Sequence, residues 1–179
     1  MPFEGLSNRT CQALQDLMAE VRELAPVQTR CWEFEVAPYQ EHGVHPGIVG
    51  DVTDWANEGY SLYYLELIGQ PNLDAVAQAF AMAKAQGVDE RSFSRLNNPS
   101  NTLYVGGSGS IATRLRQHLG YGARRTYSLH LAHWAPPLQL SFRLCCAEYA
   151  QDENVDVFQA LEDQLWDELA PMFGRKGRR

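Results

Sequence analysis

The sequence predicts an α+β fold, a small antiparallel or mixed β-sheet flanked by helices. Segments with the two-residue alternation of strands and segments with the spacing of amphipathic helices both recur along the chain. They do not alternate strictly as strand, helix and strand, which argues against a doubly wound parallel sheet. The length of 179 residues suits one domain, or one domain with an extension, and no internal repeat is visible.

The N-terminal part is expected to hold a helix and a strand. Ser7 can cap a helix that runs to about Leu24, and residues 30–37 alternate as a strand does. Residues 38–51 are rich in Gly and Pro and predict a loop. Apolar residues recur every three or four positions in the helix and predict one buried face: Leu14, Leu17, Met18, Val21 and Leu24.

The middle of the chain predicts two strands, each followed by a helix. The first strand is Ser61–Gly69, and its helix starts at the capping residue Asn72 and stops at Gly87. The second strand is the short phrase "TLYVG" at 102–106. A helix closed by Gly120 follows it.

The C-terminal part predicts a hairpin and a last helix. Residues 126–134 and 138–149 alternate as strands do, and the phrase "APP" between them suits a hairpin connection. His130 and His133 would then lie on opposite faces of the first strand. The last helix covers 155–169, with Asn154 as its cap. Its core stripe is Phe158, Leu161, Leu165 and Leu169.

Composition restricts the classes of function. The net charge of −7, from 15 basic and 22 acidic residues, argues against a general nucleic-acid coat. The stretch 106–134 nevertheless has four arginines and no Asp or Glu, so the sequence allows a basic face on an acidic body. No secretory signal and no membrane-length apolar run is visible, which favours a cytoplasmic protein that does not bind membranes. The four cysteines lack zinc-site spacing and are expected to be reduced thiols.

The phrase "GGSGS" at 106–110 raises the question of a phosphate-binding loop. It has no lysine and fits neither the Walker pattern nor G-x-G-x-x-G, so a nucleotide-binding enzyme is the less favoured alternative. The helix after it carries Arg114 and His118 one turn apart, beside an apolar stripe. Taken alone, this pair is more typical of a solvated helix edge than of a site.

The whole phrase "YVGGSGSIATRLRQH" at 104–118 resembles the second half of the GIY-YIG nuclease signature. The upstream strand of that signature is matched by "SLY" at 61–63. A later "ALEDQLWDELAP" at 160–171 resembles the family's glutamate-bearing helix and nominates Glu162. Three separate segments thus match in the family's order. The chain departs from the family by having Ser61-Leu62 in place of Gly-Ile.

The resemblance implies a metal-dependent endonuclease that hydrolyses DNA, with Mg²⁺ or Mn²⁺ as its cofactor. Arg114 would neutralise a phosphate and Glu162 would ligate the metal. Tyr63 would be the base, which requires a nearby cation that favours the phenolate, or a proton relay, since a free phenol titrates near ~10. His118 would take or pass a proton, and Tyr104 would orient groups in the site. Without the resemblance, the two tyrosines are more typical of aromatic residues packed on a strand, and Glu162 is more typical of a solvated residue.

The resemblance covers residues 60–179, with an inserted helix at 72–87, and leaves 1–59 as an N-terminal extension (helix plus strand) packed on the main domain. Specificity would come from the extension, the insertion, a homodimer or a protein partner. The alternative is a non-catalytic member that binds nucleic acid or regulates. The cations expected to touch nucleic acid are Arg116, Arg124, Arg125 and Lys176.

Overall fold

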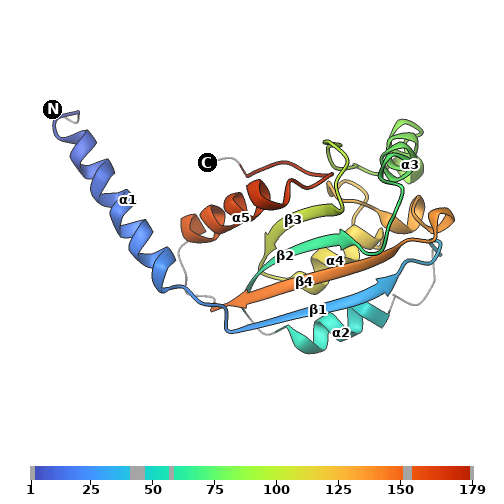
Figure 1. The fold of residues 1–179 in the computed structure, drawn as a ribbon, viewed down its shortest axis with the longest axis horizontal. Helices are drawn as coiled ribbons and strands as arrows, with labels where there is room; N and C mark the ends of the chain where they lie inside the picture. Colours follow the sequence, from blue (N-terminus) through green and yellow to red (C-terminus); the bar gives the residue numbers. More distant parts are fainter. Residues whose placement is uncertain (1–2, 41–46, 57–58, 151–154, 178–179) are drawn as a thin grey trace.

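The computed structural model describes residues 3–40, 47–56, 59–150 and 155–177. At its centre lies one antiparallel sheet with the strand order β1-β4-β2-β3, so the fold is α+β as predicted (Figure 1). The strands are β1 (Gln28–Glu35), β2 (Tyr60–Leu67), β3 (Thr102–Ser108) and β4 (Ser141–Tyr149).

Five helices accompany the sheet in the described residues. They are α1 (Leu6–Glu23), α2 (Gly47–Trp55), α3 (Leu73–Ala85), α4 (Ile111–Leu119) and α5 (Val155–Leu169). Three expected helix ends are confirmed. The Asn72 side chain accepts a hydrogen bond from the Ala75 amide at 3.1 Å, and Gly87 and Gly120 have the positive φ angles of helix-ending glycines. The expected cap Asn154 lies outside the described residues.

The N-terminal segment contributes a strand to the central sheet. β1 pairs along its length with β4, with Cys31 opposite Cys145. The helix before it, α1, is present as predicted but begins at Leu6 instead of after a Ser7 cap. None of its residues is buried, so the expected buried face is wrong. Figure 1 shows α1 projecting from the body of the molecule, where only its C-terminal end meets other elements.

The segment 38–51, predicted as a loop, is partly helical. α2 begins at Gly47 and buries three residues, Ile48, Val49 and Val52. Their spacing of one and four positions places them on one side of a helix, where they join the main core. Two glycines in a short helix conceal this pattern, because glycine disfavours helix in isolation. Burial of the apolar side outweighs that propensity here.

The hairpin predicted at 126–149 is wrong in its first half. Residues 126–134 form a loop that makes one isolated bridge, Phe93 to Ser128, and then a 3-10 turn at Leu131–His133. The phrase "APP" leads into another 3-10 turn, Pro136–Leu138. The alternation misled because His130 is buried together with the leucines on either side of it. Alternation indicates a strand only where the polar positions face solvent. In a loop folded into the core, the polar position is buried like its neighbours, so the pattern does not distinguish such a loop from a strand.

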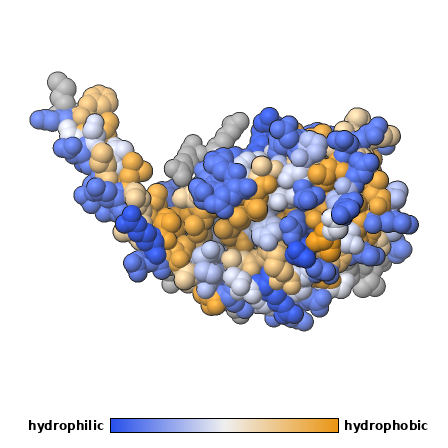
Figure 2. All heavy atoms as spheres, viewed as in Figure 1, coloured by the Kyte–Doolittle hydropathy of each residue, from blue (hydrophilic) through white to orange (hydrophobic). Residues whose placement is uncertain are grey.

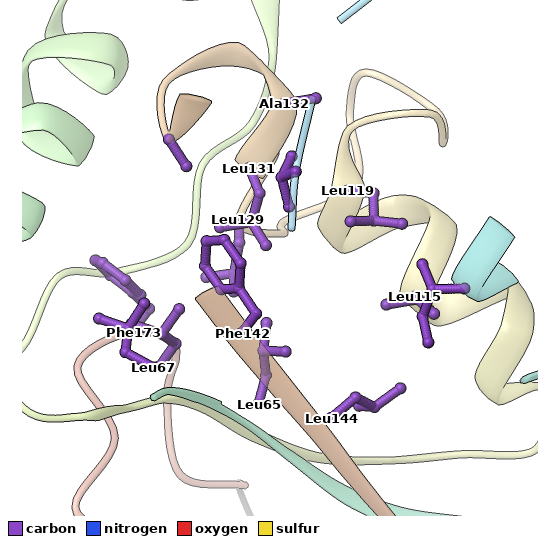
Figure 3. Close-up of a cluster of buried hydrophobic side chains, with 14 of the residues drawn as sticks. Leu65, Leu67, Leu115, Leu119, Leu129, Leu131, Ala132, Phe142, Leu144 and Phe173 are labelled. Carbon is purple, nitrogen blue, oxygen red and sulfur yellow. The ribbon is translucent and has the colours of Figure 1, made fainter. Parts of the chain in front are cut away.

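Two apolar clusters hold the sheet between helices. The larger packs Leu65, Leu144 and Phe142 of the sheet against helical residues such as Leu115 and Leu119 (Figure 3). This cluster also takes in buried residues of α2 and α3. A smaller cluster, on the other side of β2, contains Leu62, Tyr149 and Phe158, with Leu161 and Leu165 of α5 packed against it. The sheet is therefore covered by α4 on one face and by α5 on the other.

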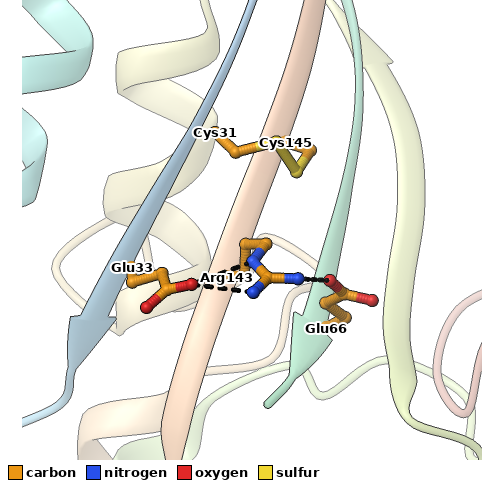
Figure 4. Close-up of a disulfide and its surroundings, with 5 residues drawn as sticks. All are labelled: Cys31, Glu33, Glu66, Arg143 and Cys145. Carbon is orange, nitrogen blue, oxygen red and sulfur yellow. Dashed lines mark hydrogen bonds and ion pairs between the residues drawn. A yellow bond between two sulfur atoms is a disulfide. The ribbon is translucent and has the colours of Figure 1, made fainter.

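A disulfide joins Cys31 to Cys145 across β1 and β4 (Figure 4). The expectation of reduced thiols is therefore wrong for this pair, because the strand register places the two residues opposite each other, with Cα atoms 4.1 Å apart. Such pairing depends on the order of strands, which cysteine spacing does not reveal. Cys146 faces the opposite way and is buried in the main core, as strand alternation predicts.

Near the disulfide, Arg143 of β4 links three strands. Its guanidinium donates hydrogen bonds to Glu33 of β1 at 2.7 Å and to Glu66 of β2 at 3.0 Å (Figure 4).

None of the described helices combines the length and the apolar character needed to cross a bilayer.

Candidate active site

The site begins where β2 and β3 lie side by side. Tyr63 of β2 is opposite Gly106 of β3, and the ring of Tyr104 lies 6.1 Å from that of Tyr63. A Cβ atom at Gly106 would lie 2.8 Å from Tyr104 Cε1 and 3.0 Å from the Tyr63 hydroxyl. Glycine at this position therefore leaves room for both tyrosine rings to approach the backbone of β3.

Glycine at the next position serves another tyrosine. A Cβ at Gly107 would lie 1.9 Å from the hydroxyl of Tyr60, so a larger residue fits there only if the Tyr60 side chain moves. Both glycines belong to β3, which ends only at Ser108. The glycine pair thus lies within a strand and accommodates aromatic rings, and it does not form the helix-entry loop that cradles a phosphate.

Helix α4 brings Arg114 and His118 to the same place. Residues four apart on a helix lie one above the other, so both side chains point to the tyrosines while Leu115 and Leu119 point to the core. The Arg114 Nε donates a hydrogen bond to the Tyr63 hydroxyl at 3.2 Å, and Nη2 donates to the Tyr104 hydroxyl at 2.9 Å. From the sequence alone, Arg114 and His118 are typical of a solvated helix edge, but in the structure both side chains face the interior.

Two more hydrogen bonds fix the Arg114 guanidinium. Nη1 donates to the Gln117 side-chain oxygen at 2.7 Å, and Nη2 also donates to the Tyr127 carbonyl at 3.3 Å. Since a guanidinium has five N–H groups, one N–H on Nη1 remains. Arg114 can therefore act on a bound anion through its charge and a single donor, while the other four donors keep the group in place.

His118 and Tyr63 form a buried pair of neutral groups. His118 is 1% exposed, and its Nε2 lies 2.9 Å from the Tyr63 oxygen. Burial, followed by the charge of Arg114, lowers the pKa of His118 well below 6.5. Burial also raises the pKa of Tyr63 well above 10, although Arg114 acts in the opposite direction. A proton can pass between Tyr63 and His118 along this contact, and the total charge of the pair then stays zero.

Glu162 reaches the site from α5, on the other face of the sheet. Its carboxylate interacts with the backbone N–H of Gly107 and with the charge of Arg114, and both lower its pKa. Burial is the largest influence and the charge of Asp163 the next, and together they raise the net pKa of Glu162. The same carboxylate raises the pKa of Tyr63 and of Tyr60, after burial itself. All five predicted site residues therefore belong to one electrostatic neighbourhood.

The residues present offer few ligands for a metal. The described residues contain no group of three or more His, Cys, Asp or Glu side chains that could hold an ion. Mg²⁺ commonly binds through one or two carboxylates and keeps several waters, so a single glutamate fits such an ion. Glu162 is the available carboxylate, and its negative charge beside two tyrosines favours a cation there.

The cations predicted to touch nucleic acid are not gathered at this site. Arg124 pairs with Asp89 at 2.9 Å, and Lys176 pairs with Asp167. Arg116 is exposed and, two positions from Arg114, lies on a different flank of α4. Arg125 is exposed in the loop after α4. Their contact with nucleic acid stays a prediction.

Three residues of the site were missed by sequence reasoning. Gln117 could have been found from its three-residue spacing to Arg114, which places the two side chains together on a helix. Tyr60 has no such signal, because its approach to Gly107 depends on strand register. The role of Tyr127 is carried by its backbone carbonyl, which no sequence pattern marks.

The site opens onto a hollow of about 430 Å³. Its lining includes Tyr104, Arg114 and Tyr127, together with three further cations. This volume is within the range of ligand-binding clefts in proteins. A polar anion can thus reach Arg114 from the surface.

The chain therefore combines an arginine held by two tyrosines, a buried histidine and a nearby glutamate in one place, reached from a cationic hollow. No protein-family model, curated protein or solved structure matches the chain.

Proposed function

We propose that this chain is a metal-dependent endonuclease of the GIY-YIG type that hydrolyses phosphodiester bonds of DNA. The observation that supports this most is the cluster around Arg114, which hydrogen-bonds to both signature tyrosines while Tyr63 contacts His118. A residue that only stabilises the fold needs no such convergence of one cation and three groups able to donate or accept protons. The carboxylate of Glu162 interacts with the same cation.

Arg114 would stabilise the negative charge that grows on the phosphoryl oxygens. Its four hydrogen bonds to the protein orient it before substrate arrives, so little reorganisation is needed during the reaction. The remaining Nη1 N–H would donate to a phosphoryl oxygen.

Tyr63 and His118 would handle the proton of the attacking water. The raised pKa of Tyr63 means that it starts as a neutral phenol, and the lowered pKa of His118 means that it starts as a neutral imidazole. Tyr63 would pass its phenolic proton to His118 Nε2 and accept a proton from water in return. The relay leaves a hydroxide to attack phosphorus and an imidazolium to be discharged later.

Glu162 would hold the divalent ion, with waters completing its coordination. Such an ion, when bound, relieves phosphate charge and stabilises the leaving oxygen. Within the chain itself, neutralising the Glu162 carboxylate would remove one influence that raises the pKa of Tyr63, and this would make the proton relay easier.

A plasmid-nicking assay in Mg²⁺ or Mn²⁺ tests this proposal. Wild-type protein is expected to convert supercoiled DNA to open circles. Arg114→Ala and Glu162→Gln are each expected to reduce the rate at least 100-fold, as removal of one charge-stabilising group typically does. Tyr63→Phe keeps the packed ring but removes the hydroxyl, and a comparable loss is expected.

Arg30→Ala is the matched control, since it removes an exposed arginine from β1, the edge strand farthest from β3 in the sheet order. Its rate is expected to stay within about threefold of wild type. Circular dichroism should show that each variant remains folded. Absence of cleavage of both supercoiled plasmid and single-stranded DNA by wild-type protein in either metal would refute the proposal for the isolated chain.

The alternative is a non-catalytic module that binds nucleic acid. Two observations favour it: the protein itself already engages four of the five Arg114 donors, and Tyr63 is almost fully buried. A protein that binds DNA but nicks none, with binding unchanged by Glu162→Gln, would support this alternative.

A further inference from the structure

The hollow beside Arg114 continues into a second one. The first, of about 430 Å³, and the second, of about 640 Å³, share Arg95, Gly174 and Arg175 in their linings. We call the two together the basic groove. It runs from Tyr104 and Arg114, past Arg95 and Arg175, towards Trp166 of α5.

Among the described residues, the basic groove is lined by cations and by no carboxylate. Lys84, Arg95, Arg114 and Arg175 line its first part, and Lys176 its second, but neither lining includes Asp or Glu. The whole chain carries a net charge of −7, so an acid-free groove is not a consequence of composition. Clustered guanidinium groups of this kind are suited to phosphates.

Two of these guanidinium groups are available to a ligand. Arg95 and Arg175 are exposed, and no carboxylate among the described residues pairs with either of them. By contrast, Lys176 pairs with Asp167, and the ammonium of Lys84 donates to the Ser94 carbonyl at 2.8 Å. The groove therefore holds two unpaired charges at successive points beyond Arg114.

An exposed aromatic residue stands at the end of the groove near the site. Tyr127 is 71% exposed, although its own carbonyl accepts a hydrogen bond from Arg114. A tyrosine this exposed can offer the face of its ring to an aromatic ligand. Its position beside the proposed phosphate contact is where a base attached to that phosphate would lie.

We propose that the basic groove binds one strand of DNA with unpaired bases, with phosphates on Arg95 and Arg175 and a base stacked on Tyr127. This inference rests on the proposed function and names its substrate class: a single-stranded segment, end or flap. A positive groove combined with an aromatic platform is how proteins hold single strands, because stacking needs a base whose face is free.

Fluorescence anisotropy tests binding without catalysis. A labelled single-stranded oligodeoxynucleotide and a blunt duplex of the same length are titrated with full-length protein in EDTA. Wild-type protein is expected to bind the single strand at least tenfold more tightly. The double variant Arg95→Gln with Arg175→Gln is expected to weaken single-strand binding at least tenfold. It should also reduce the slope of log K against log salt by about 1.4, since each lost phosphate contact removes about 0.7.

Tyr127→Ala is expected to weaken single-strand binding about 5- to 100-fold, and Tyr127→Phe, which keeps the stacking face, should bind as wild type does. The charge-matched control is Arg30→Gln on β1, the edge strand farthest from β3 in the sheet order, and it should not change affinity. Thermal unfolding should confirm that the variants are folded. Equal or tighter binding of the duplex, or wild-type affinity in the double arginine variant, would overturn the inference.

This inference and the nuclease proposal can fail separately. If wild-type protein nicks DNA while the groove variants bind single strands normally, the nuclease stands and the groove does not. If the groove variants lose binding while no metal supports nicking, the strand-binding groove stands and the nuclease does not.

Discussion

Helices α4 and α1 carry similar apolar spacing but occupy opposite environments. In α4, Leu115 and Leu119 are four residues apart and fully buried, and the adjacent flank presents Arg114 and His118 to the site. In α1, Leu14 and Met18 are also four residues apart, yet each is about half exposed. Apolar surface is visible on the projecting helix (Figure 2).

The difference shows that periodicity predicts a helix but not its burial. α4 follows β3 after a short turn, so it returns directly onto the sheet and packs beside α2. α1 precedes the edge strand β1 and meets mainly α5. A helix beside an edge strand has less surface to cover. The predictions below use this contrast, beginning with the largest expected effect.

Leu115→Ala should cost about 2–5 kcal/mol of unfolding free energy, because the side chain is 1% exposed and its removal leaves a cavity between α4 and the sheet. Urea unfolding followed by circular dichroism measures it. A loss below about 1 kcal/mol would mean that α4 is not seated on the sheet as the structure has it, and the contrast with α1 would disappear.

The buried histidine of α4 should make the stability of the protein depend on pH in the acidic range. Helix α1 contains no histidine and contributes no such dependence. The pKa of His118 is lowered by burial, so between pH 6.5 and 5.5 the unfolded chain takes up a proton that the native protein does not bind. Stability therefore falls as pH falls, by about 1 kcal/mol between pH 6.5 and 5.5 for this group. Urea unfolding at both pH values measures the change.

His118→Gln is the informative variant for this effect. It should be less stable at pH 7, because the contact with Tyr63 is altered, but its loss of stability between pH 6.5 and 5.5 should be smaller by about 1 kcal/mol. His130, whose pKa is lowered to about 4, remains in both proteins and contributes equally to each. Identical pH dependence in wild type and variant would show that His118 is already accessible to protons in the native state.

Much of the fold follows from local patterns. The strands at β2 and β3 and the helix α3 with its Asn72 cap are expected from alternation, apolar spacing and capping chemistry, and the structure has them. The features that could not be predicted depend on contacts distant in sequence. The disulfide requires β1 to lie beside β4, and residues 126–134 fold as a loop because the core accepts His130.

The candidate site also has one part that local sequence patterns predict and another part that depends on contacts distant in sequence. Arg114 and His118 share a helix, so their proximity is readable from spacing. Their meeting with Tyr63 and Tyr104 was expected only through the resemblance to a family signature, since strand register brings them together. Arg95 and Arg175 were not anticipated, because the groove forms where the loop after α3 meets the chain after α5.

The smallest effect is expected on α1. Leu14→Ala should change the unfolding free energy by no more than about 0.5 kcal/mol, because the leucine is 51% exposed and alanine favours helix. The measurement is urea unfolding at two protein concentrations that differ tenfold. A loss above 2 kcal/mol that grows with protein concentration would mean that a second copy covers the apolar stripe of α1 in solution. In that case α4 would be buried by its own chain and α1 by a second copy. The periodicity of α1 would then have predicted burial correctly.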